Sequence, residues 1–146
     1  MAERWAVVTG AAGGIGRATC QQLATQGFGV FMLDLQDAAL VDASDRLRAM
    51  GSRTETMCAD ATTAATPEEA RARVETLGRV DAVVNLAGGS GPRPIQRIEE
   101  LDDELWDHVV ALNVTSTFRF CRAFVPGMRE RRHGRIVNMS STLARS

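Results

Sequence analysis

Apolar runs of strand length alternate along this chain with longer segments that repeat apolar residues at helical spacing. The apolar runs predict five strands, at residues 5–9, 29–33, 54–59, 80–86 and 135–139. Most of them are continuous, as in parallel strands buried on both faces, whereas residues 54–59 alternate and are expected at a sheet edge. Helices are predicted between them, at residues 14–26, 38–50, 66–77 and 102–130. The alternation indicates βαβ units and therefore an α/β fold with a doubly wound parallel sheet.

The helical segments carry signals for their ends and their inward faces. Gly27 and Gly51 are predicted to stop the first two helices. Thr66 is expected to cap the third helix, with Pro67 at its first position. The apolar residues expected to face the sheet are Ile15, Ala18, Thr19 and Leu23 in the first helix and Leu40, Leu47 and Met50 in the second. In the fourth helix the apolar stripe is too wide for one sheet, so a further covering element is expected.

Composition limits the kinds of partner. The 146 residues fit one domain, and the formal net charge of −1 favours neither a nucleic acid nor a membrane surface as partner. No apolar run approaches the roughly 20 residues that span a bilayer, and the N-terminal residues carry no secretory signal. We therefore expect a cytoplasmic protein without a membrane partner.

Cysteine and histidine are too few and too scattered to predict metal or redox chemistry. Cys20, Cys58 and Cys121 form no CxxC pair and are expected to be buried, reduced thiols, and no metal site is predicted. His108 and His133 stand alone, and we expect them on a helix surface and in a turn, without a catalytic role.

The segment Thr9–Gly16 reads Thr-Gly-Ala-Ala-Gly-Gly-Ile-Gly and directly follows the first apolar run. A buried strand, a glycine turn and a helix start together bind dinucleotides. Gly10 permits the tight turn, Gly14 lets the backbone approach a pyrophosphate, and Gly16 lets the helix pack close to its strand. The amides at the helix start, including that of Ile15, would point at the phosphates, with the positive end of the helix dipole behind them.

Five further segments follow this turn. Asp34 ends the second strand, and Asp60-Ala61 follows the third. The fourth strand leads into Asn85-Leu86-Ala87-Gly88, and the long helix contains Leu112-Asn113-Val114-Thr115-Ser116. The fifth strand lies within Gly134–Ser141, which ends in a serine doublet. With the glycine turn, these motifs make the sequence similar to the classical branch of the short-chain dehydrogenase/reductase (SDR) family.

The resemblance runs over essentially the whole chain but covers only a little more than the first half of a typical family member. It implies a Rossmann-type sheet of strand order 3-2-1-4-5, truncated after the fifth strand. Residues 1–146 would then form an NAD(P)-binding domain that lacks the C-terminal part of the family fold. Because the long helix often builds a subunit interface in the family, a homo-oligomer is expected.

The resemblance also implies the coenzyme contacts. Asp34 would bind the adenosine ribose hydroxyls and repel the extra phosphate of NADP, which favours NAD. Arg17 is the counterargument, because a guanidinium could hold that phosphate, so NADP stays the alternative. Asp60 and Ala61 would contact the adenine edge by side chain and backbone amide.

Two more motifs would lie near the other end of the coenzyme. Asn85, Ala87 and Gly88 match the family's Asn-Asn-Ala-Gly turn, whose small residues let a ribose approach, with Leu86 in place of the second asparagine. Asn113 matches a helix asparagine whose backbone carbonyl holds a water of the proton relay, and a capping or kink residue is the alternative.

The serine doublet carries the implied chemistry. Ser141 aligns with the catalytic serine that polarises the substrate carbonyl, with Ser140 as the alternative if the register shifts by one. The family's general acid/base is a tyrosine in a Tyr-x-x-x-Lys pair, about a dozen residues further along the chain. This sequence contains no tyrosine and no lysine, and Arg145 cannot act as a base. We therefore expect the 146-residue chain alone to be inactive.

Together these features predict an NAD-dependent oxidoreductase that transfers a hydride between the nicotinamide and a small alcohol or ketone. The chain would be its N-terminal portion. Two other interpretations stay open, namely a dinucleotide-binding module without catalysis and an unstable product of an interrupted gene. Arg93, in the loop after Gly88, would meet an acidic substrate or be an ordinary exposed side chain.

Overall fold

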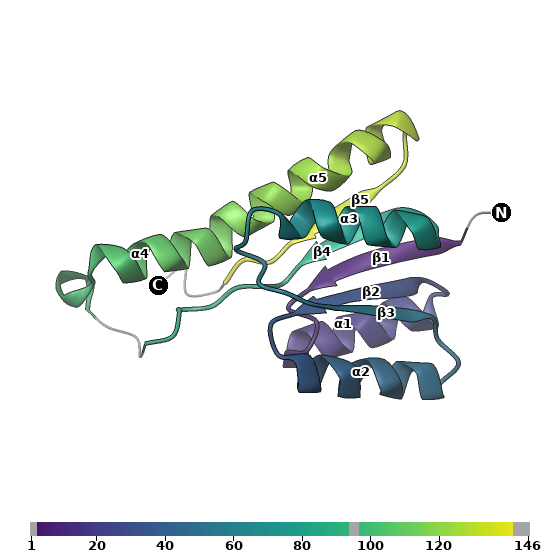
Figure 1. Ribbon diagram of the computed structural model, residues 1–146, viewed down its shortest axis with the longest axis horizontal. Coiled ribbons are helices and arrows are strands. Elements are labelled where there is room, and N and C mark those ends of the chain that lie inside the picture. The colour runs from purple at the N-terminus through teal and green to yellow at the C-terminus, as the bar shows by residue number, and fades with distance from the viewer. Residues whose placement is uncertain (1–2, 94–96, 142–146) are drawn as a thin grey trace.

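A five-stranded parallel sheet forms the centre of the computed structural model, which describes residues 3–93 and 97–141 (Figure 1). The strands are β1 (Arg4–Thr9), β2 (Gly29–Asp34), β3 (Thr54–Cys58), β4 (Arg79–Asn85) and β5 (Arg135–Asn138). Their order is β3-β2-β1-β4-β5, and each neighbouring pair is parallel. The predicted α/β class, the Rossmann-type strand order and the edge position of β3 are confirmed.

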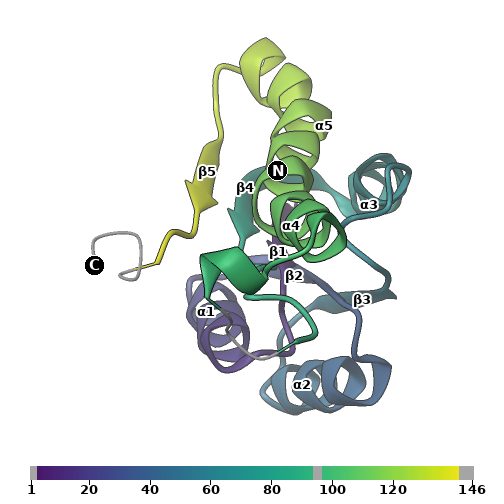
Figure 2. The same cartoon turned by 90° about the vertical axis from the view of Figure 1, so that its left-hand side faces the viewer.

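Helices cover both faces of this sheet. They are α1 (Gly14–Thr25), α2 (Asp37–Ala49), α3 (Thr66–Leu77), α4 (Asp103–Val110) and α5 (Ser116–Glu130), with a short 3-10 turn η1 (Ile98–Glu100) before α4. Figure 2 shows α1 and α2 on one side of the strands and α3 and α5 on the other. No helix within the described residues is long and apolar enough to cross a membrane.

Two hydrophobic cores follow from the period-2 alternation of the strands. One face of the sheet buries Val7 and Phe31 against Val74 of α3 and Phe120 and Phe124 of α5. On the other face, Val8, Val30 and Met32 pack against Cys20 of α1 and Leu40 and Leu47 of α2. Because both faces are covered, the strands read as continuous apolar runs in the sequence.

The inward faces of α1 and α2 differ partly from the prediction. Ile15 is 62% exposed and Ala18 is also exposed, whereas Gly16 and Cys20 are the buried residues of α1. Met50 is 59% exposed, because it is the C-cap residue of α2 and lies beyond the helical face that meets the sheet. The inward face of α1 is set by the close approach of Gly16, a residue that a hydrophobic pattern does not mark.

The predicted helix 102–130 is interrupted. A π-helical turn, η2 (Ala111–Thr115), separates α4 from α5. The hydroxyl of Ser116 donates to the carbonyl of Leu112 at 2.6 Å, and the amide of Asn113 donates to the carbonyl of Val109 at 2.9 Å. Polar side chains that bond to helix carbonyls compete with the regular backbone ladder. The Ser116 and Asn113 side-chain bonds occur at the π-helical turn η2.

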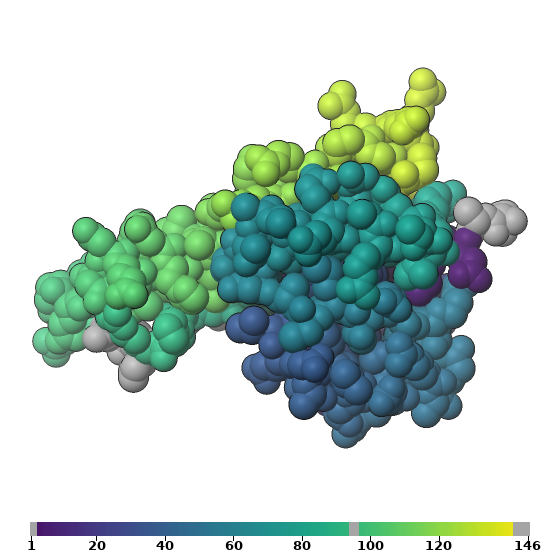
Figure 3. Space-filling model, viewed as in Figure 1, coloured from purple at the N-terminus to yellow at the C-terminus, as the bar shows by residue number. Residues whose placement is uncertain are grey.

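The apolar stripe of this long segment is only partly covered. Phe120 and Phe124 are buried, while Trp106, Val114 and Phe118 are each more than half exposed. Beyond the sheet, α3 packs against α5, but among residues 3–93 and 97–141 no element covers these exposed side chains, so the expected covering is only partly found. Figure 3 shows α4 projecting from the body of the molecule, on the side where the strands have their carboxyl ends.

Thr66 does not cap α3. It is the first residue of the helix, Ala65 is the N-cap, and Pro67 lies in the first turn. The Thr66 hydroxyl donates instead to the carbonyl of Asp60 at 2.8 Å. This bond fixes the turn that joins β3 to α3, because it ties the start of the helix to the end of the strand.

The outer edge of β3 is closed by two arginines. Val30 donates to the carbonyl of Arg53, so the alternate carbonyls of Thr54 and Thr56 face away from β2. Arg48 of α2 donates to the Thr54 carbonyl at 3.2 Å, and Arg73 of α3 donates to the Thr56 carbonyl at 3.0 Å. Positively charged side chains at these carbonyls protect an edge strand from further pairing.

Cysteine burial was predicted correctly for one residue of three. Cys20 is fully buried, Cys121 is half-buried and Cys58 is exposed, and all three are free thiols. The prediction failed at Cys58 because it ends an edge strand. Both histidines were placed correctly, since His108 lies on the exposed side of α4 and His133 lies in the turn before β5.

A cysteine-labelling experiment checks this burial. Burial raises the pKa of the Cys20 thiol to about 12, so at neutral pH it carries almost no reactive thiolate. At pH 8, iodoacetamide is expected to modify Cys58 first and Cys20 only after unfolding, as read by mass spectrometry of peptides. Labelling in denaturant is the control, where all three should react. Equal rates for Cys20 and Cys58 in the folded protein would contradict the described packing.

Two glycines of α1 provide a matched pair for stability. A Cβ at Gly16 would lie 2.1 Å from the carbonyl oxygen of Gly10, whereas a Cβ at Gly14 would meet nothing within 4 Å. Gly16→Ala is expected to destabilise the fold by about 1–3 kcal/mol or more. Gly14→Ala is expected to leave stability unchanged or raise it by up to about 1 kcal/mol. Urea unfolding measures both, and equal costs would contradict the close approach at Gly16.

Candidate functional site: a cleft at the carboxyl ends of the strands

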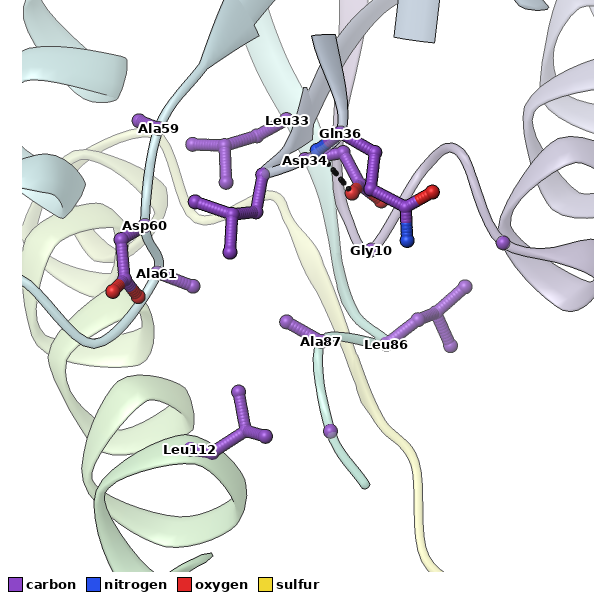
Figure 4. Close-up of a pocket in the computed structure, with 13 residues that line it drawn as sticks. Gly10, Leu33, Asp34, Gln36, Ala59, Asp60, Ala61, Leu86, Ala87 and Leu112 are labelled. Atoms are coloured by element: carbon purple, nitrogen blue, oxygen red, sulfur yellow. Dashed lines mark hydrogen bonds between the residues drawn. The ribbon is translucent and has the colours of Figure 1, made fainter. Parts of the chain in front are cut away.

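A cleft of about 290 Å³ opens at the carboxyl ends of the central strands. Its walls come from the glycine turn, the ends of β2, β3 and β4, and the π-helical turn η2. In Figure 4, Ala61, Ala87 and Leu112 surround the same space, with Gly10 and Asp34 on its far side. Ligands of open α/β sheets bind at this edge, where the connections on either side of β1 run to opposite faces.

Six of the ten predicted coenzyme residues line this cleft, namely Gly10, Asp34, Asp60, Ala61, Ala87 and Gly88. The other four, Gly14, Ile15, Gly16 and Asn85, are not among its lining residues. Gly14, Ile15 and Gly16 form the first turn of α1 beside it, and Asn85 lies in the sheet beneath it.

The glycine turn lies directly against the end of β4. Gly10 has φ +66°, and a Cβ there would lie 2.9 Å from the Ala87 nitrogen. Only glycine adopts this conformation and this approach without strain. The turn therefore holds the first wall of the cleft against the fourth strand.

The start of α1 has open space in front of it. Its N-cap is Gly13, no side chain caps it, and no acidic residue lies in its first turn. A Cβ at Gly14 would extend into empty space. Free amide groups at the positive end of a helix dipole suit an anion, and missing side chains let it come close. The turn therefore fits the pyrophosphate of a dinucleotide.

The carboxylate of Asp34 is held by two backbone amides. Ala12 donates to Oδ2 at 2.9 Å, and Gln36 donates to Oδ1 at 3.0 Å, a bond drawn as a dashed line in Figure 4. The side chain is thus fixed between the glycine turn and the start of α2. A fixed carboxylate at this point suits hydroxyl donors such as those of a ribose.

The guanidinium of Arg17 forms hydrogen bonds to other groups of the protein. It donates to the carbonyl of Ala12 at 2.9 Å, to Asp42 at 2.9 Å and to the carbonyl of Ala39 at 3.1 Å. The Arg17 and Arg46 guanidinium groups hold the pKa of the Asp42 carboxyl below its usual range. Arg17 thus ties the glycine turn to α2.

The turn after β3 forms the opposite wall. One oxygen of the Asp60 carboxylate accepts from the amide of Thr62 at 2.8 Å and from its hydroxyl at 2.7 Å. Ala61 is buried and lines the cleft. The turn is therefore shaped by its own side chains and places a small residue toward the cleft.

Thr9 supports the cleft from below, a role that the sequence patterns did not predict. Its hydroxyl oxygen accepts from the amides of Leu86 and Ala87, both at 3.1 Å, and the side chain is 1% exposed. This hydroxyl joins the ends of β1 and β4 below the cleft. The available signal was a polar residue at the end of an otherwise apolar strand, immediately before Gly10.

Asn85 faces the sheet rather than the cleft. Its amide donates to the Asn138 side chain at 2.8 Å, and the residue is 3% exposed. Its Oδ1 has no hydrogen-bond partner among the described residues. The neighbouring Leu86, where the family has an asparagine, packs against the α1/α2 core. Asn85 therefore links β4 to β5.

Asn113 clamps the loop that follows β4. Its amide donates to the carbonyl of Gly89 at 2.8 Å, and the Gly89 amide donates back to Oδ1 at 3.0 Å. A Cβ at Gly88 would lie 2.8 Å from this oxygen, so only glycine leaves it room. The Asn113 carbonyl, to which the resemblance gives a water-holding role, accepts from the Thr117 hydroxyl at 3.3 Å.

The serines of the doublet follow β5 at this edge of the sheet. Ser140 and Ser141 are exposed, and neither belongs to the residues lining the cleft. Arg93, considered above as a substrate contact, pairs with Asp102 and Glu104 at the start of α4. Asp102 also caps this helix by accepting from the Leu105 amide at 2.8 Å. Arg93 thus fastens its loop to α4.

These features define an α/β domain with a Rossmann-type sheet and an open cleft at the carboxyl ends of its strands, and comparison with known proteins assigns its family. The family model described as short chain dehydrogenase matches residues 4–146, and the chain belongs to this family. The SDR resemblance of the sequence is thereby confirmed.

Individual relatives agree with this assignment. Cyclohexanol dehydrogenase of a Rhodococcus species is 39% identical over 150 residues, which cover 93% of this chain and 56% of that protein. A crystal structure of an actinorhodin polyketide ketoreductase variant with NADPH has a TM-score of 0.90 at 35% identity and covers 99% of this chain and 55% of its own. A 3-oxoacyl-[acyl-carrier protein] reductase from Brucella melitensis with bound NAD gives a TM-score of 0.89 at 33% identity, with 99% and 55% covered. The chain thus spans about half the length of the proteins it matches.

The role of Thr9 is open to a direct test. Thr9→Val keeps the shape but removes the acceptor for two buried amides, and we expect a loss of about 1–3 kcal/mol in unfolding free energy. Thr9→Ser, which keeps the hydroxyl, should lose much less. Chemical denaturation measures both variants. If the valine and serine variants lost equal stability, the hydroxyl would not hold the end of β4.

Proposed function

We propose that this chain binds a nicotinamide dinucleotide in the cleft, as the coenzyme-binding part of an oxidoreductase acting on a small alcohol or ketone. The observation that carries the proposal is the open start of α1 beside the fixed carboxylate of Asp34. The amides of Gly14 and Ile15 would hold the pyrophosphate, and Asp34 would bind the adenosine ribose. Asp60 and Ala61 would meet the adenine, and Ala87 and Gly88 would lie against the second ribose.

We propose NAD rather than NADP as the preferred coenzyme. Asp34 presents a negative charge where NADP carries its additional phosphate, and like charges repel. Arg17, the cation that could have offset this repulsion, is bonded to Ala12, Ala39 and Asp42. Solved relatives bind NADPH in one case and NAD in another, so the preference rests on these local charges.

The chemistry is a hydride transfer, for which the bound nicotinamide supplies the donor or acceptor carbon. Ser141, or Ser140 in the shifted register, would donate a hydrogen bond to the substrate oxygen. Asn113 would keep the Gly89 loop in place and offer its carbonyl to the proton relay. The sequence has no tyrosine or lysine, so the general acid/base would come from outside these 146 residues.

A second candidate is a dinucleotide-binding module without catalysis, since the described cleft and its carboxylates would serve coenzyme binding alone equally well. Both candidates would bind the coenzyme, and only the oxidoreductase would catalyse a reaction with it. We further propose a cytoplasmic homo-oligomer. The exposed Trp106, Val114 and Phe118 of the segment from α4 to α5 support self-association, because burying large apolar side chains against another subunit is favourable.

Coenzyme titration tests the proposal. NADH binding to the purified protein should raise the nicotinamide fluorescence, and calorimetry should show tighter binding of NAD than of NADP. Asp34→Asn removes the charge and should shift the NAD/NADP affinity ratio toward NADP by about tenfold, the effect of roughly 1.4 kcal/mol. Asp37→Asn, an equal charge change in the exposed first turn of α2, is the matched control.

The outcomes separate the claims. Folded protein that binds neither coenzyme would contradict the proposed function. Binding with an NAD/NADP ratio that Asp34→Asn leaves unchanged would contradict the coenzyme preference alone. Coenzyme binding by the natural protein without oxidation of any alcohol or reduction of any ketone would favour the non-catalytic module.

A further inference from the structure

Arg119 of α5 reaches across to the turn that forms the adenine-side wall of the cleft. Its Nη1 donates to the carbonyl oxygen of Thr62 at 2.6 Å, although the two residues are 57 positions apart in the sequence. Arg119 is half-buried. A hydrogen bond from a charged donor is stronger than one between neutral groups, so this contact is a firm link between α5 and the turn.

The other bonds of the turn are local. Thr62 bonds to the Asp60 carboxylate by amide and hydroxyl, and Thr63 donates to the Asp60 carbonyl at 3.1 Å. Thr66 donates to the same carbonyl from the start of α3. These bonds give the turn its shape but fix it only to its own neighbours in sequence. Arg119 provides a contact with a distant element.

The helical segment that carries Arg119 also lines the cleft. Leu112, seven residues earlier and so about two helical turns away, points toward the same space as Ala61 (Figure 4). The segment therefore contributes one wall through Leu112 and holds the facing wall through Arg119. Ala61 also packs in the core cluster that contains Phe120, so the Arg119 bond adds to this packing in holding the two walls of the cleft apart.

We propose that Arg119 is a positioning residue for the adenine end of the coenzyme, holding the Asp60–Ala61 turn at the spacing that this end requires. The proposal rests on the proposed function, because it assigns the adenine to this wall. Without the guanidinium, the turn keeps its local bonds and the packing of Ala61 but is held less firmly at its distance from Leu112. Coenzyme binding must then restore that distance, and affinity falls.

The alternative is that Arg119 only adds to the stability of the fold. In that case a folded variant would bind adenine nucleotides as well as the unaltered protein does. The two roles are therefore distinguished by affinity measured in folded protein, with unfolding followed separately.

Three variants provide the test in the purified natural protein. Arg119→Met removes the donors and keeps an unbranched apolar stem, and Arg119→Lys keeps one charged donor group. Arg122→Met is the matched control, because Arg122 lies on the same helix with its guanidinium 5.1 Å from the centre of the Phe118 ring. The probes are AMP, which carries only the adenine half of the coenzyme, and NADH, both titrated by calorimetry.

We expect Arg119→Met to weaken AMP and NADH binding alike, by about tenfold, as the loss of a charge-assisted hydrogen bond allows. Arg119→Lys should recover most of this loss, and Arg122→Met should bind as the unaltered protein does. If the methionine variant does not fold, Arg119→Lys and Arg119→Gln are compared, and the lysine variant should bind more tightly.

Other outcomes would overturn the proposal. Unchanged AMP affinity in folded Arg119→Met would leave the residue a structural role alone, while coenzyme binding by the unaltered protein kept the proposed function intact. A loss for NADH without a loss for AMP would place the effect away from the adenine end. Folded, unaltered protein that binds neither AMP nor NADH would remove the proposed function and this inference together.

Discussion

The backbone of the glycine turn has to pack against itself and against the end of β4 with no side chain in between. A Cβ at Gly16 would collide with the Gly10 carbonyl, and a Cβ at Gly10 would collide with the backbone of Leu86 and Ala87. These contacts fix the start of α1 beside the cleft, and the Thr9 hydroxyl holds the same strand end from below. The proposed contacts to the pyrophosphate and to Asp34 are positioned by this turn, since Ala12 also holds the Asp34 carboxylate.

Charge is distributed around the cleft so that its carboxylates stay unneutralised. Among residues 3–93 and 97–141, Asp34 and Asp60 form no ion pair, and their oxygens accept from backbone amides and a hydroxyl instead. The nearby guanidinium groups of Arg17 and Arg119 bond mainly to carbonyl oxygens, and Arg17 pairs with Asp42. The cleft therefore has a carboxylate on each of two walls, and carboxylates suit hydroxyl and amino donors.

Local patterns predicted the order of the elements and the parallel sheet, because hydrophobic periodicity and glycine spacing are encoded within short windows. The strand order and the roles of the coenzyme motifs came from the family resemblance. The predictions from local patterns failed where the local structure depends on contacts with residues outside the short sequence window. Thr66 has the chemistry of a cap, but its hydroxyl bonds to Asp60. The π-helical turn around Asn113 depends on side chains that bond to helix carbonyls. Arg119 gave no signal at all, since an arginine on a helix is usually a solvated side chain and its partner is distant in sequence.

The arginines bonded to the Thr54 and Thr56 carbonyls determine which edge of the sheet can accept a further strand. Because Arg48 and Arg73 occupy the outward acceptors of β3, a strand arriving at that edge would have to displace two charged donors. At the opposite edge, β5 carries Val137 and flanking Met139 with their side chains about half exposed. A sixth strand, whether supplied by the same polypeptide or by another, is thus directed to β5, which makes this sheet extensible from one side only.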